Sequence, residues 1–339
     1  MESMFLPFLL VIFASFFQGS FGLGMKYMGP LKWESWWLTH VTISMVLFPL
    51  IWAYIAVPDL FGVIGTAFSD PTIVDAVYLA MFFGFLWGIG GIMFGVSIPY
   101  IGLSLTYGLV MGLASSVGSV IPLLQMENAS EQAAFPYIMA GVIVMLVGVA
   151  ITAYAGIERD KLKSDVDKNG SIVKGIVIAS ICGVLSAFLN VGFANAAPVQ
   201  KLAEASGALT RNSSLAAWVV VLIGAYVMNA GYAIYLLFKN KSWNSFNVSG
   251  SKKAYMWSLV AGLCWFAALG ISGQGAALLG EIGPVITWPI MLGLSLIVGN
   301  IWAYSSGEWK GAKKPFAILL AGLAVLIVAT YILGYSQFV

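Results

Sequence analysis

The chain has 339 residues, of which 60% are hydrophobic and only 9% are charged, whereas roughly a quarter of the residues in an ordinary soluble domain are charged. This composition excludes a soluble globular domain, and the net charge of +2 argues against nucleic acid as a partner. The chain has two cysteines, one histidine and no Walker, zinc or nucleophile motif. The sequence therefore predicts no metal site, no cofactor and no catalytic residues.

Ten apolar segments are long enough to cross the roughly 30 Å hydrocarbon core of a bilayer as helices, which takes about 20 residues each. We expect them near residues 4–24, 35–57, 73–96, 103–124, 135–156, 172–193, 214–238, 254–279, 285–306 and 316–335. The apolar runs are continuous and show no period of two, which excludes a β-barrel. The first segment follows Glu2 rather than a basic stretch, so we expect it to remain as a mature helix. The sequence predicts an all-α integral membrane protein.

The distribution of basic residues supports ten helices independently of hydropathy, because cytoplasmic loops accumulate Lys and Arg. With ten spans, only Lys201 and Arg211 of the sixteen basic residues fall on one side of the membrane, and the rest fall on the other. A nine- or eleven-helix arrangement would scramble this alternation. We therefore expect both termini outside the cytoplasm.

An internal repeat accompanies this arrangement. An offset of 181 residues aligns residues 101–127 with 282–308 without a gap and gives eight identities in 27 positions, among them Gly112 with Gly293. One position after a shared threonine, Tyr107 falls opposite Trp288. A second offset, of 172 residues, places Gln18 over Asn190.

Five helices per half is an odd number, so two homologous halves would lie in the membrane with opposite orientations, as in many secondary transporters. We expect a first five-helix repeat over residues 1–156, a cytoplasmic linker over 157–171 and a second repeat over 172–339. The charges of the linker fit a solvated loop, and we assign them no chemistry.

Amides and aromatic rings inside the predicted spans are the candidates for a binding site. Amides pair with the hydroxyls of a sugar while rings cover its C–H faces. The candidate substrate contacts are Gln18, Trp87, Tyr107, Asn190, Asn195, Asn229, Trp265, Gln274, Trp288 and Asn300. The same polar groups also fit interhelical hydrogen bonds in helix packing, and both interpretations stay open.

A carrier coupled to protons needs a group that changes protonation during its cycle. The ionisable residues within or beside the spans are Glu281, His40 and Asp75. Glu281 is the first candidate because it adjoins Gly280 and Gly283 just before the repeated block. His40 titrates in the right range, although a lone histidine in a bundle also serves as a structural hydrogen-bonding residue. Asp75, near an outer helix end, also fits a solvated position.

Three segments resemble the L-rhamnose–proton symporters, a branch of the drug/metabolite transporter superfamily. They are FGFLWGIGGIMFGVSIPYIGLSL (residues 83–105), CGVLSAFLNVGFANAAPV (182–199) and ITWPIMLGLSLIVGNIWAYSSGEWKGAKKP (286–315). The resemblance implies a drug/metabolite transporter-like fold. It also implies import of L-rhamnose or a related deoxyhexose across the inner membrane, coupled to protons in preference to sodium.

The sequence thus predicts a secondary active sugar transporter with a site between its halves and alternating access. One alternative is an exporter of drugs or metabolites from the same superfamily, in which the aromatic residues would contact flat hydrophobic solutes. A membrane-embedded enzyme is a second alternative. It would need clustered His, Asp or Glu within the helices, which a chain with one histidine does not offer.

Overall fold

A computed structural model describes residues 5–163 and 172–339, and its regular secondary structure there is helical throughout. Ten helical segments in this part are long and apolar enough to cross a membrane, which confirms the predicted number. Their bounds are Leu6–Tyr27, Trp33–Ala56, Val74–Ile101, Leu103–Gln125, Phe135–Leu162, Ile172–Ala205, Thr210–Lys239, Lys252–Leu278, Gly280–Ser305 and Lys313–Phe338. Glu2 and residues 164–171 of the predicted linker lie outside the described residues.

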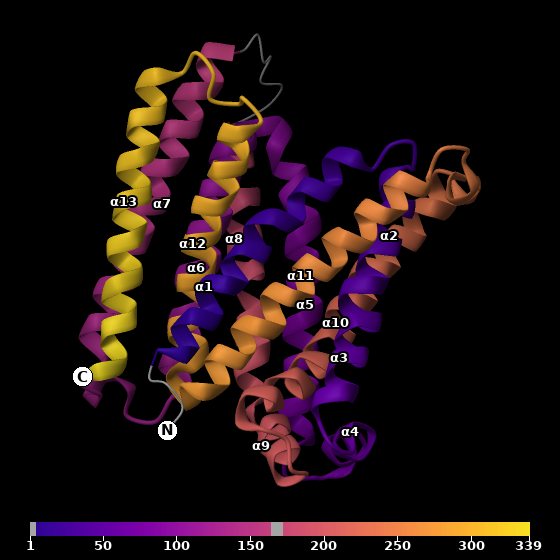
Figure 1. Ribbon diagram of the computed structural model, residues 1–339, viewed down its shortest axis with the longest axis vertical. Coiled ribbons are helices and arrows are strands. Elements are labelled where there is room, and N and C mark those ends of the chain that lie inside the picture. The colour runs from indigo at the N-terminus through magenta and orange to yellow at the C-terminus, as the bar shows by residue number, and fades with distance from the viewer. Residues whose placement is uncertain (1–4, 164–171) are drawn as a thin grey trace. The chain divides into compact units, whose positions relative to one another are not determined.

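The α-helices follow one another along the chain as shown in Figure 1. They are α1 (Leu6–Ser20), α2 (Trp33–Thr42), α3 (Phe48–Ala56), α4 (Leu60–Ser69), α5 (Val74–Ile101), α6 (Leu103–Gln125), α7 (Phe135–Lys163), α8 (Ile172–Asn195), α9 (Ala197–Ala205), α10 (Thr210–Lys239), α11 (Lys252–Leu278), α12 (Gly283–Ser305) and α13 (Lys313–Tyr335). The 3₁₀ turns used below are η1 (Phe21–Tyr27), η4 (Trp243–Asn247) and η5 (Gly280–Ile282), and a π-helical turn, η2 (Ile43–Leu47), joins α2 to α3.

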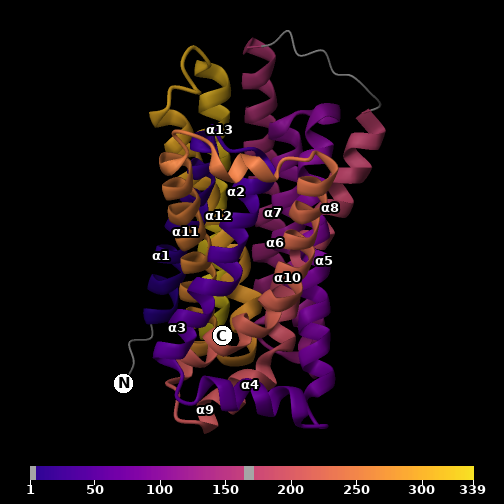
Figure 2. The same ribbon diagram turned by 90° about the vertical axis from the view of Figure 1, so that its right-hand side faces the viewer.

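Two short helices, α4 and α9, were not predicted. The ten residues of α4 are too few to span a bilayer. Asp59 is the N-cap residue of this helix, has a left-handed backbone (φ 47°) and accepts a hydrogen bond from the Gly62 N–H. The two helices pack on each other, as both views show (Figure 1 and Figure 2). The Ser206 hydroxyl donates to the Pro58 carbonyl at 2.9 Å and ties the chain after α9 to the chain before α4.

The contacts divide the chain into two compact units, and each unit combines segments from both predicted halves. Unit 1 comprises Met1–Gly88 and Gly192–Leu278, and unit 2 comprises Ile89–Val191 and Leu279–Val339. The boundaries fall inside α5 and α8, so these two helices contribute to both units. This spatial division does not test the predicted sequence repeat, which stays a prediction.

In unit 1, α1 lies along α11, and α10 packs on α2 and α11. Glycines allow the close approach of α1 and the following turn η1 to α11. A Cβ atom added at Gly24 would lie 2.7 Å from the Ala261 Cβ, and one at Gly275 would lie 2.8 Å from the Pro7 carbonyl oxygen. The two helices therefore run antiparallel, with one close contact near each end.

In unit 2, α13 runs beside α7 (Figure 1), and α12 packs on α6 and α13. Glycines again set the spacing. A Cβ atom at Gly141 would lie 2.6 Å from the Leu333 Cγ, and one at Gly148 would lie 2.7 Å from a Leu326 methyl group. Such small residues at helix contacts are typical of membrane bundles, in which close backbone packing stabilises association.

Candidate functional site

Unit 1 brings three of the predicted substrate contacts to the same part of α5. The rings of Trp87 and Trp265 lie 5.4 Å apart at a tilt of 36°, and Trp265 is 5% exposed. The next residue, Gly88, faces α10, where an added Cβ atom would lie 3.1 Å from the Asn229 Nδ2. Two indoles and a buried amide therefore surround one turn of α5.

Asn229 links this group to α2. Its Oδ1 accepts a hydrogen bond from the Trp37 indole N–H at 3.2 Å, and its Nδ2 donates to the Ala225 carbonyl at 2.9 Å. The amide is 2% exposed. The Trp37 ring in turn lies 5.2 Å from the His40 ring. The sequence did not indicate Trp37 as part of a site, because it stands in a tryptophan-rich helix edge typical of interfacial anchors.

His40 is enclosed by aromatic rings on α2 and η1. Its ring stacks on Trp36 at 5.2 Å with an interplanar angle of 7°, and on Phe21 at 6.5 Å. The side chain is 1% exposed, its Nδ1 has no hydrogen-bond partner, and the backbone of Ser258 hydrogen-bonds the imidazole. The ring is thus buried between aromatic faces, which attract a cation placed over them.

Unpaired buried polar atoms concentrate in unit 1. Among the described residues, the buried side-chain N and O atoms without a hydrogen-bond partner belong to Gln18, Trp36, His40, Ser44, Trp218 and Trp257 in unit 1 and to Trp309 in unit 2. Leaving a buried polar group unpaired costs about 1–3 kcal/mol. Such groups are candidates for contact with a polar solute or a proton.

Gln18 is the predicted substrate contact among them. Its Oε1 is buried and unpaired. On α1, Gln18 lies between the two glycine contacts with α11 described above, and Trp265 lies between the same contacts on α11. The unpaired amide and the indole pair therefore occupy the middle stretch of neighbouring helices in unit 1.

Two further predicted amides in unit 1 lie elsewhere. The Gln274 Nε2 donates to the Asn212 Oδ1 at 3.0 Å, and the Asn212 Nδ2 donates to the Ala56 carbonyl at 3.4 Å. Gln274 therefore takes part in a chain of hydrogen bonds at the end of α3. Asn195 is half-buried and is the last residue of α8.

Unit 2 pairs its predicted polar residues with backbone carbonyls. The Asn190 Nδ2 donates to the Gly118 carbonyl at 2.8 Å and to the Pro284 carbonyl at 2.9 Å. The Trp288 indole donates to the Ala114 carbonyl at 2.9 Å. Asn190 and Trp288 are 2% and 5% exposed. In this structure both side chains join helices, which is the packing role that the sequence left open.

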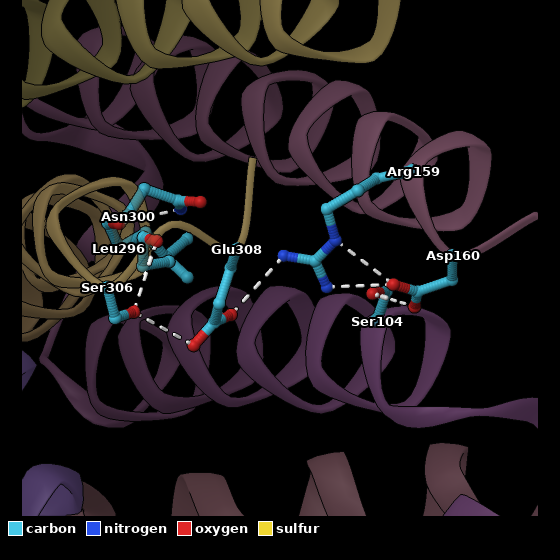
Figure 3. Close-up of polar contacts among 8 residues, drawn as sticks. Ser104, Arg159, Asp160, Leu296, Asn300, Ser306 and Glu308 are labelled. Carbon is cyan, nitrogen blue, oxygen red and sulfur yellow. Dashed lines mark hydrogen bonds and ion pairs between the residues drawn. The ribbon is translucent and has the colours of Figure 1, made fainter. Parts of the chain in front are cut away.

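The remaining candidates of unit 2 have no buried polar partner on another helix. Tyr107 is 39% exposed and packs edge-on against Phe94. The Asn300 Nδ2 donates to the Leu296 carbonyl of its own helix at 2.9 Å, as Figure 3 shows.

The two carboxylate candidates for proton coupling lie at helix ends. Glu281 is exposed on η5 and lines an open hollow of about 480 Å³ together with Gln132 and Gln337. Asp75 is exposed in the first turn of α5. Neither carboxylate is enclosed by protein as His40 is.

A charged cluster in unit 2 was not anticipated from the sequence (Figure 3). Arg159 pairs with Asp160 at 2.8 Å and with Glu308 at 3.5 Å, and its guanidinium lies 4.8 Å from the centre of the Trp309 ring. The Ser104 hydroxyl donates to Asp160 at 2.6 Å. The cluster joins the start of α6, the end of α7 and the chain after α12, so the charges of Arg159 and Asp160 do more than mark a solvated loop.

Ten apolar spans define a multi-pass membrane protein. The sequence model of the L-rhamnose-proton symport protein family matches residues 5–338, and the chain belongs to this family. It is a transporter family, so the enzyme interpretation is excluded.

Similar proteins include L-rhamnose-proton symporters of Yersinia pestis (strain Pestoides F) and Yersinia pseudotuberculosis serotype O:1b. Each is 29% identical over 322 residues, which is 92% of this chain and 92% of the relative. A solved crystal structure, described only as that of a protein, matches with a TM-score of 0.52 at 13% identity. It covers 95% of this chain and 96% of its own, and this likeness concerns the fold alone.

Proposed function

We propose that the protein imports L-rhamnose or a related deoxyhexose together with protons. The observation that carries this proposal is the family match over residues 5–338. Relatives named L-rhamnose-proton symporters align over 92% of the chain, which supports the same activity and does not favour an exporter. Proton is the proposed coupling ion, in preference to sodium.

The proposed sugar contacts are Gln18, Trp87 and Trp265 in unit 1. The unpaired Oε1 of Gln18 accepts a sugar hydroxyl, and the indole pair, 5.4 Å apart, covers an apolar face of the sugar. A 6-deoxyhexose suits such a site because its methyl group adds apolar surface. Asn229 acts through Trp37, whose indole it holds.

His40 is the proposed proton carrier. Its Nδ1 is buried without a partner, so a proton that arrives there needs no existing hydrogen bond to break. The ring stacked on it at 5.2 Å, Trp36, stabilises the imidazolium through its π face. Glu281 and Asp75 remain second choices, as groups at the membrane surface.

The inverted repeat is proposed on the pattern of helix contacts in unit 2. There α6 packs on α7, and the helices expected to be their repeat partners, α12 and α13, pack on each other. In addition, α6 packs on α12 and α7 on α13. Such reciprocal pairing is what a two-fold relation between halves produces. It supports a drug/metabolite transporter-like arrangement with alternating access.

The proposed location is the bacterial inner membrane, with both termini on the periplasmic side. Contacts within unit 1 support the charge sorting on which this orientation rests. Lys32 precedes α2 at one end of the α2–α3 span, whereas Arg211 adjoins Asn212, whose amide reaches Ala56 at the other end. Arg211, one of the two basic residues expected outside the cytoplasm, therefore lies at the opposite end of this span from Lys32, as the ten-helix topology requires.

Purified protein in sealed liposomes tests the function. We expect uptake of radiolabelled L-rhamnose to follow an inward proton gradient and to collapse with an uncoupler. Uptake that survives without any ion gradient would exclude coupled symport. Competition by a panel of deoxyhexoses and pentoses would identify the sugar class, and failure of every sugar to compete would exclude sugar import.

His40→Gln tests the proton carrier in the same liposomes. We expect gradient-driven accumulation to be lost while exchange of internal for external sugar continues, because exchange needs no net proton movement. Glu281→Gln is the matched control and should retain accumulation. Accumulation retained in His40→Gln and lost in Glu281→Gln would assign the role to Glu281.

A further inference from the structure

One end of unit 1 carries a group of exposed lysines, here called the lysine face. It consists of Lys32, Lys239, Lys241, Lys252 and Lys253, all of which are exposed. These residues come from three separate places in the chain, at the start of α2, around the end of α10 and at the start of α11.

Contacts hold these segments together. Glu34, in the first turn of α2, accepts hydrogen bonds from the Asn240 amide at 3.1 Å and from the Ser242 hydroxyl. The Ser245 hydroxyl lies 2.9 Å from the Ser35 hydroxyl. Lys253 lies over the Tyr27 ring at 5.3 Å. The lysine face is therefore one surface rather than a set of separate loops.

Few acidic side chains lie near the lysine face to neutralise its positive charge. Of the acidic residues described in unit 1, only Glu34 lies at this end, and it is 5% exposed and already bound by Asn240 and Ser242. The others stand in or beside α4 and α9 or at the start of α5, namely Asp59, Asp70, Asp75 and Glu204. In unit 2, Arg159 pairs with Asp160 and Glu308, and Lys161 pairs with Glu158.

Helix stability does not explain where these lysines stand. Lys32 is the N-cap residue of α2, and Lys252 and Lys253 begin α11. A cation beside a helix N-terminus is disfavoured by the helix dipole, by about 0.3–1 kcal/mol. An external anion would reverse the sign of this contribution.

Aromatic side chains of the kinds found at membrane interfaces lie beside the lysine face. Trp243, on η4, is 44% exposed and packs against Phe238. Lys239 lies over the Tyr235 ring at 5.6 Å. Tryptophan and tyrosine concentrate at membrane interfaces, and lysine stems extend along apolar surface to bring the ammonium group to that level.

We propose that the lysine face binds the phosphate headgroups of anionic phospholipids. Clusters of four to eight basic residues directly beside membrane helices attract anionic lipid, each contributing about 1 kcal/mol. The exposed indole of Trp243 enters the interface beside the bound headgroup. The proposed lipid site lies at the end of unit 1 that carries the lysine face.

Native mass spectrometry of the detergent-purified protein tests this proposal. The protein is titrated separately with phosphatidylglycerol and with phosphatidylcholine, and the bound lipids are counted. We expect wild-type protein to retain phosphatidylglycerol preferentially. The triple variant Lys239→Gln, Lys252→Gln, Lys253→Gln should lose affinity for phosphatidylglycerol on the order of 100-fold, since three contributions are removed.

The matched control is Lys310→Gln, Lys313→Gln, Lys314→Gln, which removes the same charge from exposed lysines of unit 2. It should bind phosphatidylglycerol like the wild type. A variant with arginine at Lys239, Lys252 and Lys253 keeps the charge and should also bind. Melting temperatures in phosphatidylcholine confirm that each variant is folded.

Equal loss in both triple variants, or undiminished binding in the unit 1 variant, would overturn the proposal. Inorganic phosphate distinguishes the source of the anion. If phosphate at the same concentration displaces phosphatidylglycerol, the surface takes a free anion and the assignment to lipid is wrong. These outcomes do not depend on sugar uptake, so the proposal stands or fails independently of the transported substrate.

Discussion

Gln18 in unit 1 and Asn190 in unit 2 hold aligned positions in the predicted repeat, yet their amides have different surroundings. The Asn190 Nδ2 donates to the carbonyls of Gly118 and Pro284. The Oε1 of Gln18 is buried and has no partner. The same contrast holds for the units as wholes, because most unpaired buried polar atoms of the described residues belong to unit 1.

This difference indicates a division of roles. An amide that bonds two backbone carbonyls of other helices stabilises the helix packing, and its removal deletes both hydrogen bonds. An unpaired buried amide lowers stability while it remains available to a ligand. We infer that unit 2 uses its polar groups for structure and that unit 1 keeps polar groups for transport.

The largest effect is expected for Asn190→Ala. The substitution removes both hydrogen bonds from the Asn190 amide to the carbonyls of Gly118 and Pro284, and we expect stability to fall by about 2–3 kcal/mol. Thermal unfolding in detergent measures this loss. An unfolding midpoint like that of the wild type would show that unit 2 does not depend on the amide, and the comparison between the units would fail.

Gln18→Leu should impair transport without lowering stability, the reverse of the effect expected for Asn190→Ala. It removes a buried acceptor that has no partner, so we expect stability to be unchanged or slightly higher. Sugar uptake should fall roughly tenfold, which corresponds to about 1.4 kcal/mol of lost binding. The two measurements are the unfolding midpoint and the KM of L-rhamnose uptake. Lower stability with an unchanged KM would show that Gln18, like Asn190, stabilises helix packing and does not contact the sugar.

A smaller effect is expected for Trp288→Phe in unit 2. It removes the hydrogen bond from the indole to the Ala114 carbonyl and should destabilise the protein by about 1 kcal/mol. Tyr107→Phe is the control at the aligned repeat position, where no hydrogen bond to another helix is made, and should leave the unfolding midpoint unchanged. Equal effects of the two substitutions would mean that the indole hydrogen bond contributes nothing.

The smallest effect concerns Asp70, a half-buried group between α4 and α5 that stands outside the spans. Hydrogen bonds from the Thr72 N–H and hydroxyl hold the pKa of Asp70 below its ordinary value of 3.8. A lowered pKa stabilises the folded state above the unfolded pKa, and this contribution is lost as the pH falls through the folded pKa.

At pH 7 the unfolding midpoint of the wild type should therefore be slightly higher than that of Asp70→Asn. The difference between the two midpoints should vanish only below about pH 4. Thermal unfolding at pH 7, 5 and 3 checks this expectation. A difference that disappears between pH 5 and 7 would contradict it, because the titrating group would then be another one.

Much of the fold could be predicted from the sequence. Ten spans and the all-helical architecture are confirmed, because a long apolar segment already determines whether a helix crosses the bilayer. The short helices α4 and α9 were missed. Their ten and nine residues are below the length of a span, and they are stabilised by packing on each other rather than by hydropathy alone.

The candidate site could be predicted only in part. Gln18, Trp87, Trp265 and Asn229 were named from residue type and are found in unit 1. Residue type could not separate them from Asn190 and Trp288, whose partners lie 72 to 174 positions away in the chain. The charged pair of Arg159 and Glu308, 149 positions apart, was missed for the same reason.

The sequence by itself determined the number of spans and the family, since hydropathy and motif content are properties of local segments. Only the tertiary structure decided which buried polar groups are paired and which are open. Pairing depends on the meeting of distant helices, as Asn190 meets Gly118 and Pro284. A hydrogen bond forms only when donor and acceptor come within about 3 Å, a condition that no local pattern of residues can specify.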